Sequence, residues 1–355
     1  MKKTEIHTLI VWSAATDLVP EVVSCVQSKL SVLDKIEIKW QPDTFLNNLK
    51  IFYAHSQREK QEDAYNGILE RKISQIGMGT FCLLVLKDEN PQYDYRLTTS
   101  GNRYVNTNIF DLKKSVRQLV GGGNRIHASD NEFESNKDLT LLLHKNTEDY
   151  LKASKQNTYH QNVLGYDGYA DIKELFYVLN NSIDYCVLRN YECLPDEYTL
   201  KGHGDIDLLV ENHNYAKYLT LAKPVFPDLH YRVHYTIKIK GEEIPFDFRF
   251  LGDDYYDIKW QKKILESRKL YNDLVYVPDA ENYFYSLLYH AYVQKKVIKE
   301  DYYPKIEELA QANRVDYHRK MSHIEVKKIL DKFLEDNFYR YIPANDPTVI
   351  YNVKF

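Results

Sequence analysis

Two aspartates in an apolar run are the residues best suited to chemistry in this sequence. Asp205 and Asp207 belong to the stretch GHGDIDLLV at residues 202–210. Its last six residues have the pattern of a buried strand, in which alternate side chains share a face, so the two carboxylates point the same way. Carboxylates this close repel each other unless a cation lies between them. Mg²⁺ binds carboxylate oxygens and keeps substrate phosphates as further ligands, so the spacing predicts a magnesium site.

A third carboxylate lies in a second strand-like stretch, IPFDFRF at residues 244–250. Its phenylalanines alternate with Asp247 and Arg249, which places the two charged side chains on one face. If this strand lies beside the first, the three carboxylates converge, and two metal ions could clamp a phosphoryl group during an in-line displacement. The alternative is that these acids only keep a sheet edge soluble.

These residues resemble the nucleotidyltransferase superfamily related to DNA polymerase β. Its members carry a paired acid, D-x-D or D-x-E, on one strand and a third acid on a later strand. The family's phosphate-gripping Gly-Ser turn falls at Arg189 and Asn190 in this chain, within YCVLRNY at residues 185–191. Poorly characterised nucleotidyltransferase-like proteins share an LRNYE-LP run followed by DIDLLV. The fukutin/LicD group, which transfers phospho-alditols or phosphocholine to glycans, is a more distant relative.

The resemblance covers about residues 160 to 310 and implies roles for the charged residues there. Asp205, Asp207 and Asp247 are expected to bind Mg²⁺ or Mn²⁺, and Asp247 also to take the proton of the acceptor. The phosphates of an NTP donor need cationic and polar contacts, because negative charge builds on them as the bond breaks. The expected substrate-binding residues are Arg189, Asn190, Lys201, Arg249 and Lys296. Trailing helices close the nucleotide cleft in this superfamily, which adds His290 and Lys305 as candidates.

A second motif lies in the first half of the chain. Residues 124–130 read NRIHASD, and Glu134, Ser135 and Asp138 follow. The run resembles the active-site sequence of nucleoside diphosphate kinases, N-x-x-H-G-S-D followed by E-S and a later acid. In that family the histidine is phosphorylated on a ring nitrogen and passes the phosphoryl group on. This implies His127 as the nucleophile and Asp138 as the group that fixes its tautomer.

The kinase resemblance extends over about residues 5 to 145. It assigns phosphate contacts to Arg96 and Lys114 and places Tyr53 near the family's tyrosine. The chain departs from the family at Trp12, which replaces a lysine after the first strand, and at Ala128, which replaces a glycine. The lost lysine removes a cation from the phosphate site. The alternative is therefore an inherited fold in which the histidine is a buried or capping residue without a catalytic role.

The elements that position the histidine follow from the periodicity of the first half. It predicts a β-α-β-α-α-β order, which suggests an α+β sandwich of ferredoxin-like type. Strands are expected at residues 9–12, 35–41 and 80–86, and helices at 19–33, 44–54, 61–76 and 109–120. The polar residues 88–105 are expected to be irregular.

The second half predicts the elements that position the three aspartates. Strands are expected at residues 185–188, 205–210, 229–240 and 244–250, and the last two form a hairpin. Helices are expected at residues 171–180, 215–223, 257–269, 278–297, 305–312 and 324–338. This order fits a nucleotidyltransferase-fold domain followed by C-terminal helices.

Length and composition bound the architecture. A chain of 355 residues exceeds what one hydrophobic core usually supports, so we expect two domains, residues 1–150 and 160–355, with a polar linker at 148–160. The net charge of −4 argues against a polyanion-binding surface over the whole molecule. The four cysteines lack metal-binding spacing. The sequence has no signal peptide and no transmembrane span, which predicts a cytoplasmic protein.

Together these patterns predict a Mg²⁺-dependent nucleotidyl- or phosphotransferase that uses an NTP-like donor and a small-molecule or glycan acceptor. The expected partners are the nucleotide, the acceptor and, through the kinase-like domain, further copies of the chain, since kinases of that family are oligomers as a rule. Two alternatives stay open. One is a phosphohistidine kinase whose second half only binds substrate, and the other is a non-catalytic nucleotide-sensing protein.

Overall fold

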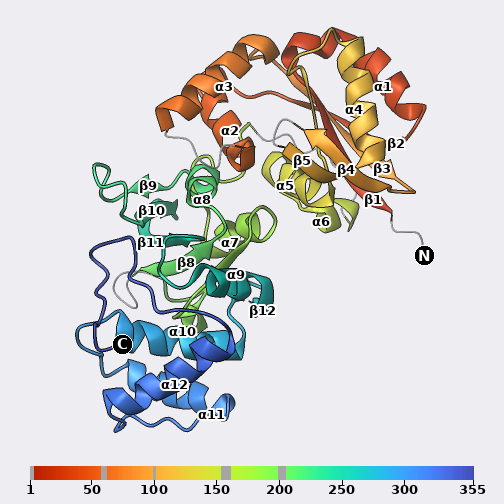
Figure 1. Ribbon diagram of the computed structural model, residues 1–355. Helices are drawn as coiled ribbons and strands as arrows, with labels where there is room; N and C mark the ends of the chain where they lie inside the picture. Colours follow the sequence, from red (N-terminus) through yellow and green to blue (C-terminus); the bar gives the residue numbers. More distant parts are fainter. Residues whose placement is uncertain (1–3, 57–61, 99–100, 153–160, 199–204) are drawn as a thin grey trace. The chain divides into compact units, whose positions relative to one another are not determined.

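The structure is a computed structural model that describes residues 4–56, 62–98, 101–152, 161–198 and 205–355. The chain forms two compact units. Unit 1 comprises residues 1–169 and 217–221, and unit 2 comprises residues 170–216 and 222–355. Both units combine helices with β-sheet (Figure 1). Within the described ranges, every helix is too short or too polar to span a bilayer.

Unit 1 is built on a four-stranded antiparallel sheet with the order β2-β3-β1-β6. The central strand β1 is buried along its whole length. Helices α1 and α4 join strands of this sheet, which gives a β-α-β-β-α-β order. The elements are β1 (Glu5–Val11), η1 (Ser13–Leu18), α1 (Val19–Gln27), β2 (Ser31–Ile38), α2 (Phe45–Phe52), η2 (Ala54–Ser56), α3 (Glu62–Ile76), β3 (Phe81–Asp88), β4 (Tyr93–Thr98), β5 (Gly101–Asn106), α4 (Thr107–Leu119), β6 (Ile126–Ala128), α5 (Glu132–Leu143) and α6 (Thr147–Lys152).

The two faces of this sheet differ in character. On one face, α1 and α4 lie side by side (Figure 1), and their valines share a hydrophobic core with Leu9 and Ala128. The opposite face meets α5 and an aromatic cluster around Trp12, whose ring lies 4.7 Å from that of Phe81. His127 points to this second face, because its neighbours in β6 belong to the first core and strand residues alternate.

Two expectations for unit 1 are corrected by the structure. The helix expected to reach Leu33 ends at Gln27, and β2 begins at Ser31. Leu30 and Val32 pack on the same core as α1, so their spacing continues the helical pattern although the chain is extended. Within residues 88–105, which were expected to be irregular, residues 93–98 and 101–105 belong to the antiparallel pair of β4 and β5. Most of this pair is exposed on both faces, so it lacks the alternation that marks a strand in sequence.

Unit 2 contains a five-stranded sheet with the order β7-β8-β11-β10-β9, in which only the β8–β11 pair is parallel. A two-residue turn joins β10 to β11. Both of its residues, Lys240 and Gly241, have positive φ, as a type I′ hairpin turn requires. The strands of unit 2 are β7 (Tyr185–Val187), β8 (Ile206–Val210), β9 (Lys223–Pro224), β10 (His234–Ile239), β11 (Glu242–Phe250), β12 (Lys269–Tyr271) and β13 (Val275–Val277).

The C-terminal helices of unit 2 share an aromatic core. The ring of Trp260 contacts those of Tyr289 and Phe333, which come from three different helices. Helix α10 ends at Val293, four residues before its expected end at Val297. The helical segments are α7 (Ile172–Asn180), η3 (Tyr191–Cys193), α8 (His213–Thr220), whose last residues group with unit 1, α9 (Ile258–Ser267), α10 (Ala280–Val293), α11 (Tyr302–Ala312) and α12 (His323–Asp336).

Unit 1 extends beyond the boundary expected near residue 150. The side chain of Asn48 donates to Oδ1 of Asn162 at 2.8 Å and accepts from the backbone N–H of Val163 at 2.9 Å. The backbone N–H of Leu164 also donates to the carbonyl of Leu141 at 3.0 Å. These bonds hold residues 162–164 to unit 1. Of the polar stretch expected to be a linker, residues 153–160 lie outside the described residues.

Candidate functional site

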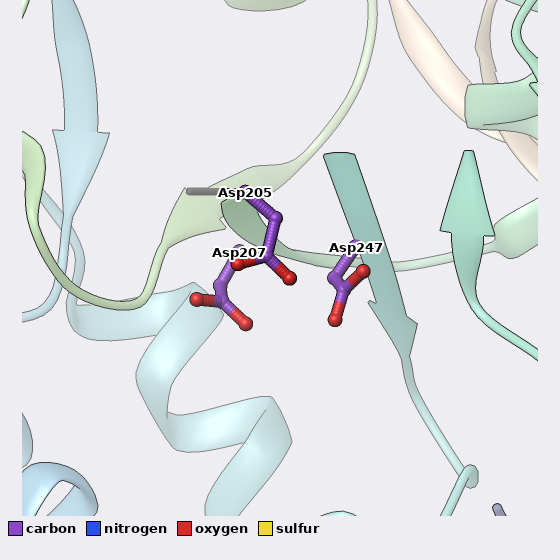
Figure 2. A group of neighbouring side chains, drawn as sticks. All are labelled: Asp205, Asp207 and Asp247. Carbon is purple, nitrogen blue, oxygen red and sulfur yellow. The ribbon is translucent and has the colours of Figure 1, made fainter. Parts of the chain in front are cut away.

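Adjacent parallel strands bring the three predicted carboxylates together. In the register of β8 and β11, Asp207 stands opposite Asp247, and Asp205 directly precedes β8. Each side chain has a carboxylate oxygen within 4.8 Å of those of the other two. Figure 2 shows the three carboxylates pointing toward the same space between the two strands. Asp207 and Asp247 are buried and Asp205 is exposed, so the cluster lies at the edge of the core.

The negative charges of the cluster oppose one another. Burial, together with the neighbouring Asp207 and Asp205, raises the pKa of Asp247 from 3.8 to about 8. Burial also raises the pKa of Asp207. Oδ1 of Asp247 is buried and has no hydrogen-bond partner among the described residues. An orphaned carboxylate oxygen beside two further carboxylates fits a divalent cation such as Mg²⁺ or Mn²⁺, which prefers oxygen ligands.

Arg189 contacts the carboxylate cluster. Its Nη2 donates to Oδ1 of Asp207 and, at 3.2 Å, to the hydroxyl oxygen of Tyr255. That hydroxyl lies 2.7 Å from Nδ1 of the buried His290. Arg189 also lines the cavity, so the substrate contact expected for it stays a prediction beside its pairing with Asp207. Asn190 lines the same cavity in a left-handed conformation, with φ of 58°.

Arg249 is held among three acids. Its Nη2 lies 4.0 Å from Oδ2 of Asp247 and 3.8 Å from Oδ2 of Asp346. Its Nη1 lies 4.0 Å from Oδ2 of Asp253. The guanidinium also stacks over the ring of Tyr255, 4.2 Å from the centroid. A buried cation shared in this way balances the acids around it. Nε and Nη1 of Arg249 are buried without a hydrogen-bond partner among the described residues, and the substrate contact expected for Arg249 stays a prediction.

The cluster opens into a cavity of about 800 Å³. Lys295 and Lys299 also line this cavity, and neither forms an ion pair within the described part of the chain. Apolar and aromatic side chains complete the wall: Tyr283, Leu287, Tyr302, Val349 and Ile350. Acids, unpaired lysines and an apolar wall in one cavity suit a small ligand that carries phosphate.

Of the lysines expected to bind substrate, one lies outside the cavity and one lines it in an ion pair. Lys296 is exposed and does not line the cavity, whereas its neighbour Lys295 does. Because α10 ends before both residues, helical periodicity cannot tell which of them faces inward. Lys305 lines the cavity, but its ammonium group lies 2.8 Å from Oε1 of Glu192. Lys201 lies outside the described residues.

His234 is a site residue that the sequence did not reveal. It stands opposite Asp247 in the β10–β11 pair, with Nε2 3.7 Å from Oδ1 of that aspartate. Nε of Arg232 lies 3.3 Å from Nδ1 of the imidazole, and its Nη2 lies 3.5 Å from Nε2. Burial, helped by Arg232, lowers the pKa of His234. Only the hairpin register, which was predicted without its exact pairing, could have pointed to this residue.

In unit 1, His127 is hydrogen-bonded to its expected partner. Nε2 lies 2.9 Å from Oδ2 of Asp138, which also accepts from the hydroxyl of Thr8 at 2.7 Å. The bond places the proton on Nε2 and leaves the lone pair on Nδ1. No hydrogen bond among the described residues reaches Nδ1. The side chain is buried, and the rings of Phe52 and Tyr53 pack edge-on against it.

Further buried charges surround this imidazole. Nζ of Lys137 lies 3.1 Å from Oδ1 of Asp138 and 2.9 Å from Nδ1 of His55. Nε2 of His55 lies 3.3 Å from Oε1 of Glu134, and that oxygen is 3.9 Å from Nε2 of His127. Burial, together with Lys137, lowers the pKa of His55. The network fixes the histidine in one orientation from several sides.

The cations nearest to His127 differ from those the kinase resemblance suggested. Lys113 donates to the backbone carbonyl of the next residue in β6 at 2.8 Å. Lys114 is exposed, and no described contact joins it to His127. Arg96 lies on the β4–β5 hairpin, where its Nη1 pairs with Asp94 at 2.5 Å. The structure therefore does not bring Lys114 and Arg96 together with the histidine.

Comparison with known proteins gives little to add to this geometry. No family model matches the chain. No curated protein matches it either. Among solved structures, a nucleoside diphosphate kinase from Aquifex aeolicus is similar over 41% of this chain and 99% of its own, with 13% identity and a TM-score of 0.27. An NDP kinase from Pyrobaculum aerophilum is similar over 41% of this chain and 98% of its own, with 16% identity and a TM-score of 0.23. Likeness at this level assigns no activity to the chain.

Proposed function

We propose that this protein is a Mg²⁺- or Mn²⁺-dependent transferase that moves a nucleotidyl or phosphoryl group from an NTP-like donor to a small-molecule or glycan acceptor. The observation that carries the proposal is the convergence of Asp205, Asp207 and Asp247 in a cavity that also contains the unpaired Lys295 and Lys299. Acids alone would explain a bound cation. Lysines in the same cavity add the positive charge that stabilises a reacting phosphate.

Each group in the cavity has a defined task in this proposal. The three carboxylates would hold the metal ion, which supplies charge stabilisation on the transferred group. Lys295 is half-buried, so its charge acts through less water than that of a surface lysine and would bind the donor phosphates more strongly.

The direct test uses the full chain and labelled nucleotides. Calorimetric titration with a non-hydrolysable NTP, with and without Mg²⁺, should give binding only when the metal is present. Incubation with α- or γ-labelled NTP and a panel of sugars, alditols and choline then separates the two transfers, because nucleotidyl transfer moves the α-label and phosphoryl transfer the γ-label. Metal-dependent binding without transfer of either label would favour a nucleotide sensor. Absence of metal-dependent binding would contradict the proposal.

Lys295 and Lys296 provide a matched pair for the phosphate site. Replacing Lys295 by alanine should weaken the binding of Mg²⁺–nucleotide by about tenfold or more, because a charge-assisted contact contributes about 1.5–3 kcal/mol. Replacing its exposed neighbour Lys296 should leave the dissociation constant unchanged within about twofold. The measurement is calorimetric titration of both variants beside the wild type. Equal effects of the two substitutions would remove Lys295 from the site.

A second candidate function belongs to unit 1. Asp138 holds the proton of His127 on Nε2, and Nδ1 has no described hydrogen-bond partner. This is the arrangement that a nucleophilic imidazole needs, since the lone pair of Nδ1 can attack a γ-phosphorus while the nucleoside diphosphate leaves. The close packing of Phe52 and Tyr53 around the ring restricts the approach of a nucleotide. Phosphorylation of His127 is therefore our second proposal, after transfer in unit 2.

Labelling decides whether this histidine reacts. Incubation with γ-labelled ATP should give a label on the protein that is lost in acid and kept in base, and His127→Ala should abolish it. His318→Ala, which replaces an exposed histidine far along the sequence, should label as the wild type does. If no label forms, or if His127→Ala retains it, the imidazole network is structural.

A further inference from the structure

The position of Arg189 bears on how many metal ions the carboxylate cluster binds. Three converging carboxylates suit two ions about 3.5–4 Å apart, which together clamp a transferred phosphoryl group. Such a pair needs several carboxylate oxygens that are free for both ions. In this structure, Nη2 of Arg189 already occupies Oδ1 of Asp207, the central acid of the cluster.

The charges around the cluster also disfavour a second metal ion. Among the described residues, Asp207 is the only acid that Arg189 pairs with, whereas Arg249 is shared among Asp247, Asp253 and Asp346. The guanidinium of Arg189 therefore already supplies a positive charge to an acid that a second ion would have to share. A second divalent ion on the same acid would place its charge beside this buried guanidinium, which like-charge repulsion disfavours.

A second set of contacts also holds Arg189. The hydroxyl of Tyr255 accepts from its Nη2 at 3.2 Å and lies 2.7 Å from Nδ1 of His290. The side-chain amide of Gln294 donates to the backbone carbonyl of Tyr255 at 2.5 Å. All four side chains are buried. These contacts keep the guanidinium at the cluster. A loosely held side chain could move away when a metal ion binds.

We infer that Arg189 takes the place of a second metal ion, so that the cluster binds a single divalent cation. The inference rests on the proposed metal-dependent function and concerns the number of ions and the residue that sets it. In this arrangement the guanidinium stays on Oδ1 of Asp207. The other oxygen of Asp207, the orphaned Oδ1 of Asp247 and the exposed carboxylate of Asp205 remain for the ion.

The test counts bound Mn²⁺ by the loss of the free-ion signal in electron paramagnetic resonance. The full chain is titrated with Mn²⁺ in the presence and absence of a non-hydrolysable NTP. Without nucleotide, we expect one protein-bound ion. With nucleotide, we expect no second ion at the cluster after the ions carried by the nucleotide phosphates have been subtracted. A titration of nucleotide alone measures that amount. A count of two at the cluster in the wild type overturns the inference while leaving the transferase proposal intact. A count of zero under both conditions overturns both.

Three variants test whether the guanidinium sets this number. Arg189→Met keeps much of the side-chain length without the charge, and we expect a second ion to bind or the first to bind about tenfold or more tightly. Arg189→Lys keeps the charge and should keep a count of one. The control is Arg268→Met, which removes an arginine paired with Asp184 outside the cavity and should bind Mn²⁺ as the wild type does.

The set of variants also allows for the case in which a substitution unfolds the protein. Circular dichroism of each variant checks that it is folded before the titration. If Arg189→Met is unfolded, Arg189→Lys and the wild type still decide, because a second ion in either of them contradicts the inference. A folded Arg189→Met with the count and the affinity of the wild type contradicts it as well.

Discussion

Replacing Asp247 by asparagine should abolish metal-dependent transfer and at the same time stabilise the metal-free protein at pH 8. The loss of activity should reach about a thousandfold or more, since a catalytic metal supplies several kcal/mol of charge stabilisation. The gain in stability follows from burial. The folded protein keeps a proton on Asp247 up to a pKa of about 8, whereas the unfolded chain releases it near 3.8.

The sign of the pH dependence follows from this difference. The contribution of Asp247 to the free energy of unfolding of the metal-free wild type should be fully present below about pH 4 and should fall as the pH rises toward 8, by at most about 1.4 kcal/mol per pH unit. Asp247→Asn mimics the protonated acid, so its stability should lose most of this dependence. Urea denaturation in the presence of a chelator, at a series of pH values, measures both proteins. The control is Glu242→Gln, at the exposed start of the same strand, which should behave as the wild type.

The expectation fails if the slopes of stability against pH agree between Asp247→Asn and the wild type. It also fails if the variant transfers label within a few-fold of the wild-type rate. The two readings are independent, so the electrostatic and the catalytic parts can be judged separately. Added Mg²⁺ should stabilise the wild type at pH 8 and leave the variant almost unchanged, because a ligand stabilises only the state that binds it.

Replacing Asp207 by asparagine should have the opposite effect on stability. Asp207 is paired with the buried guanidinium of Arg189, so the substitution leaves a buried cation without its counter-charge. Removing one partner of a buried ion pair costs about 3–5 kcal/mol. Asp207→Asn should therefore lower the free energy of unfolding at neutral pH by roughly that amount, in addition to its loss of transfer.

An ion pair at the surface provides the control for this prediction. Asp184 pairs with Nη2 of Arg268 at 2.6 Å, and half of its side chain is exposed. Asp184→Asn should lower the free energy of unfolding by less than about 1 kcal/mol, because solvent screens such pairs. Urea denaturation of both variants gives the comparison. If the two substitutions cost the same, the pairing of Arg189 with Asp207 does not contribute to stability in the way that the structure implies.

The convergence of the three aspartates could be predicted from the sequence, because the alternation of apolar and polar residues along a strand shows which side chains share a face. Alternation in IDLLV and FDFRF fixed which side chains share a face, and the convergence of Asp205, Asp207 and Asp247 then required only that the two strands be neighbours. The hairpin that carries Asp247 was equally visible, since Lys240-Gly241 has the composition of a tight turn. Local periodicity and turn chemistry were sufficient for this part of the site.

The positions of the basic residues were harder to predict from the sequence, because they depend on how the chain folds after a helix ends or on contacts across a core. Lys295 lies just after α10, where no period applies. The partner of Arg189 is an aspartate 18 positions away in the sequence, and nothing local distinguishes a guanidinium that pairs with an acid from one that awaits a phosphate. In unit 1, the same limit explains why a phosphate contact was predicted for Lys114, although it is Lys113 that contacts β6, the strand that carries His127.

Because the turn between β10 and β11 is tight, the chemistry of unit 2 depends on the number of residues in this turn as well as on their types. Substitutions that tolerate positive φ at Lys240 and Gly241 leave Asp247 opposite His234. One residue added to or removed from the turn would shift β11 by one place against β10, and a shift of one place exchanges the two faces of a strand. Asp247 would then face the apolar core and Phe246 or Phe248 the cavity. Natural variants of this protein should accordingly keep the two-residue length of this turn and vary in composition only among residues that tolerate positive φ.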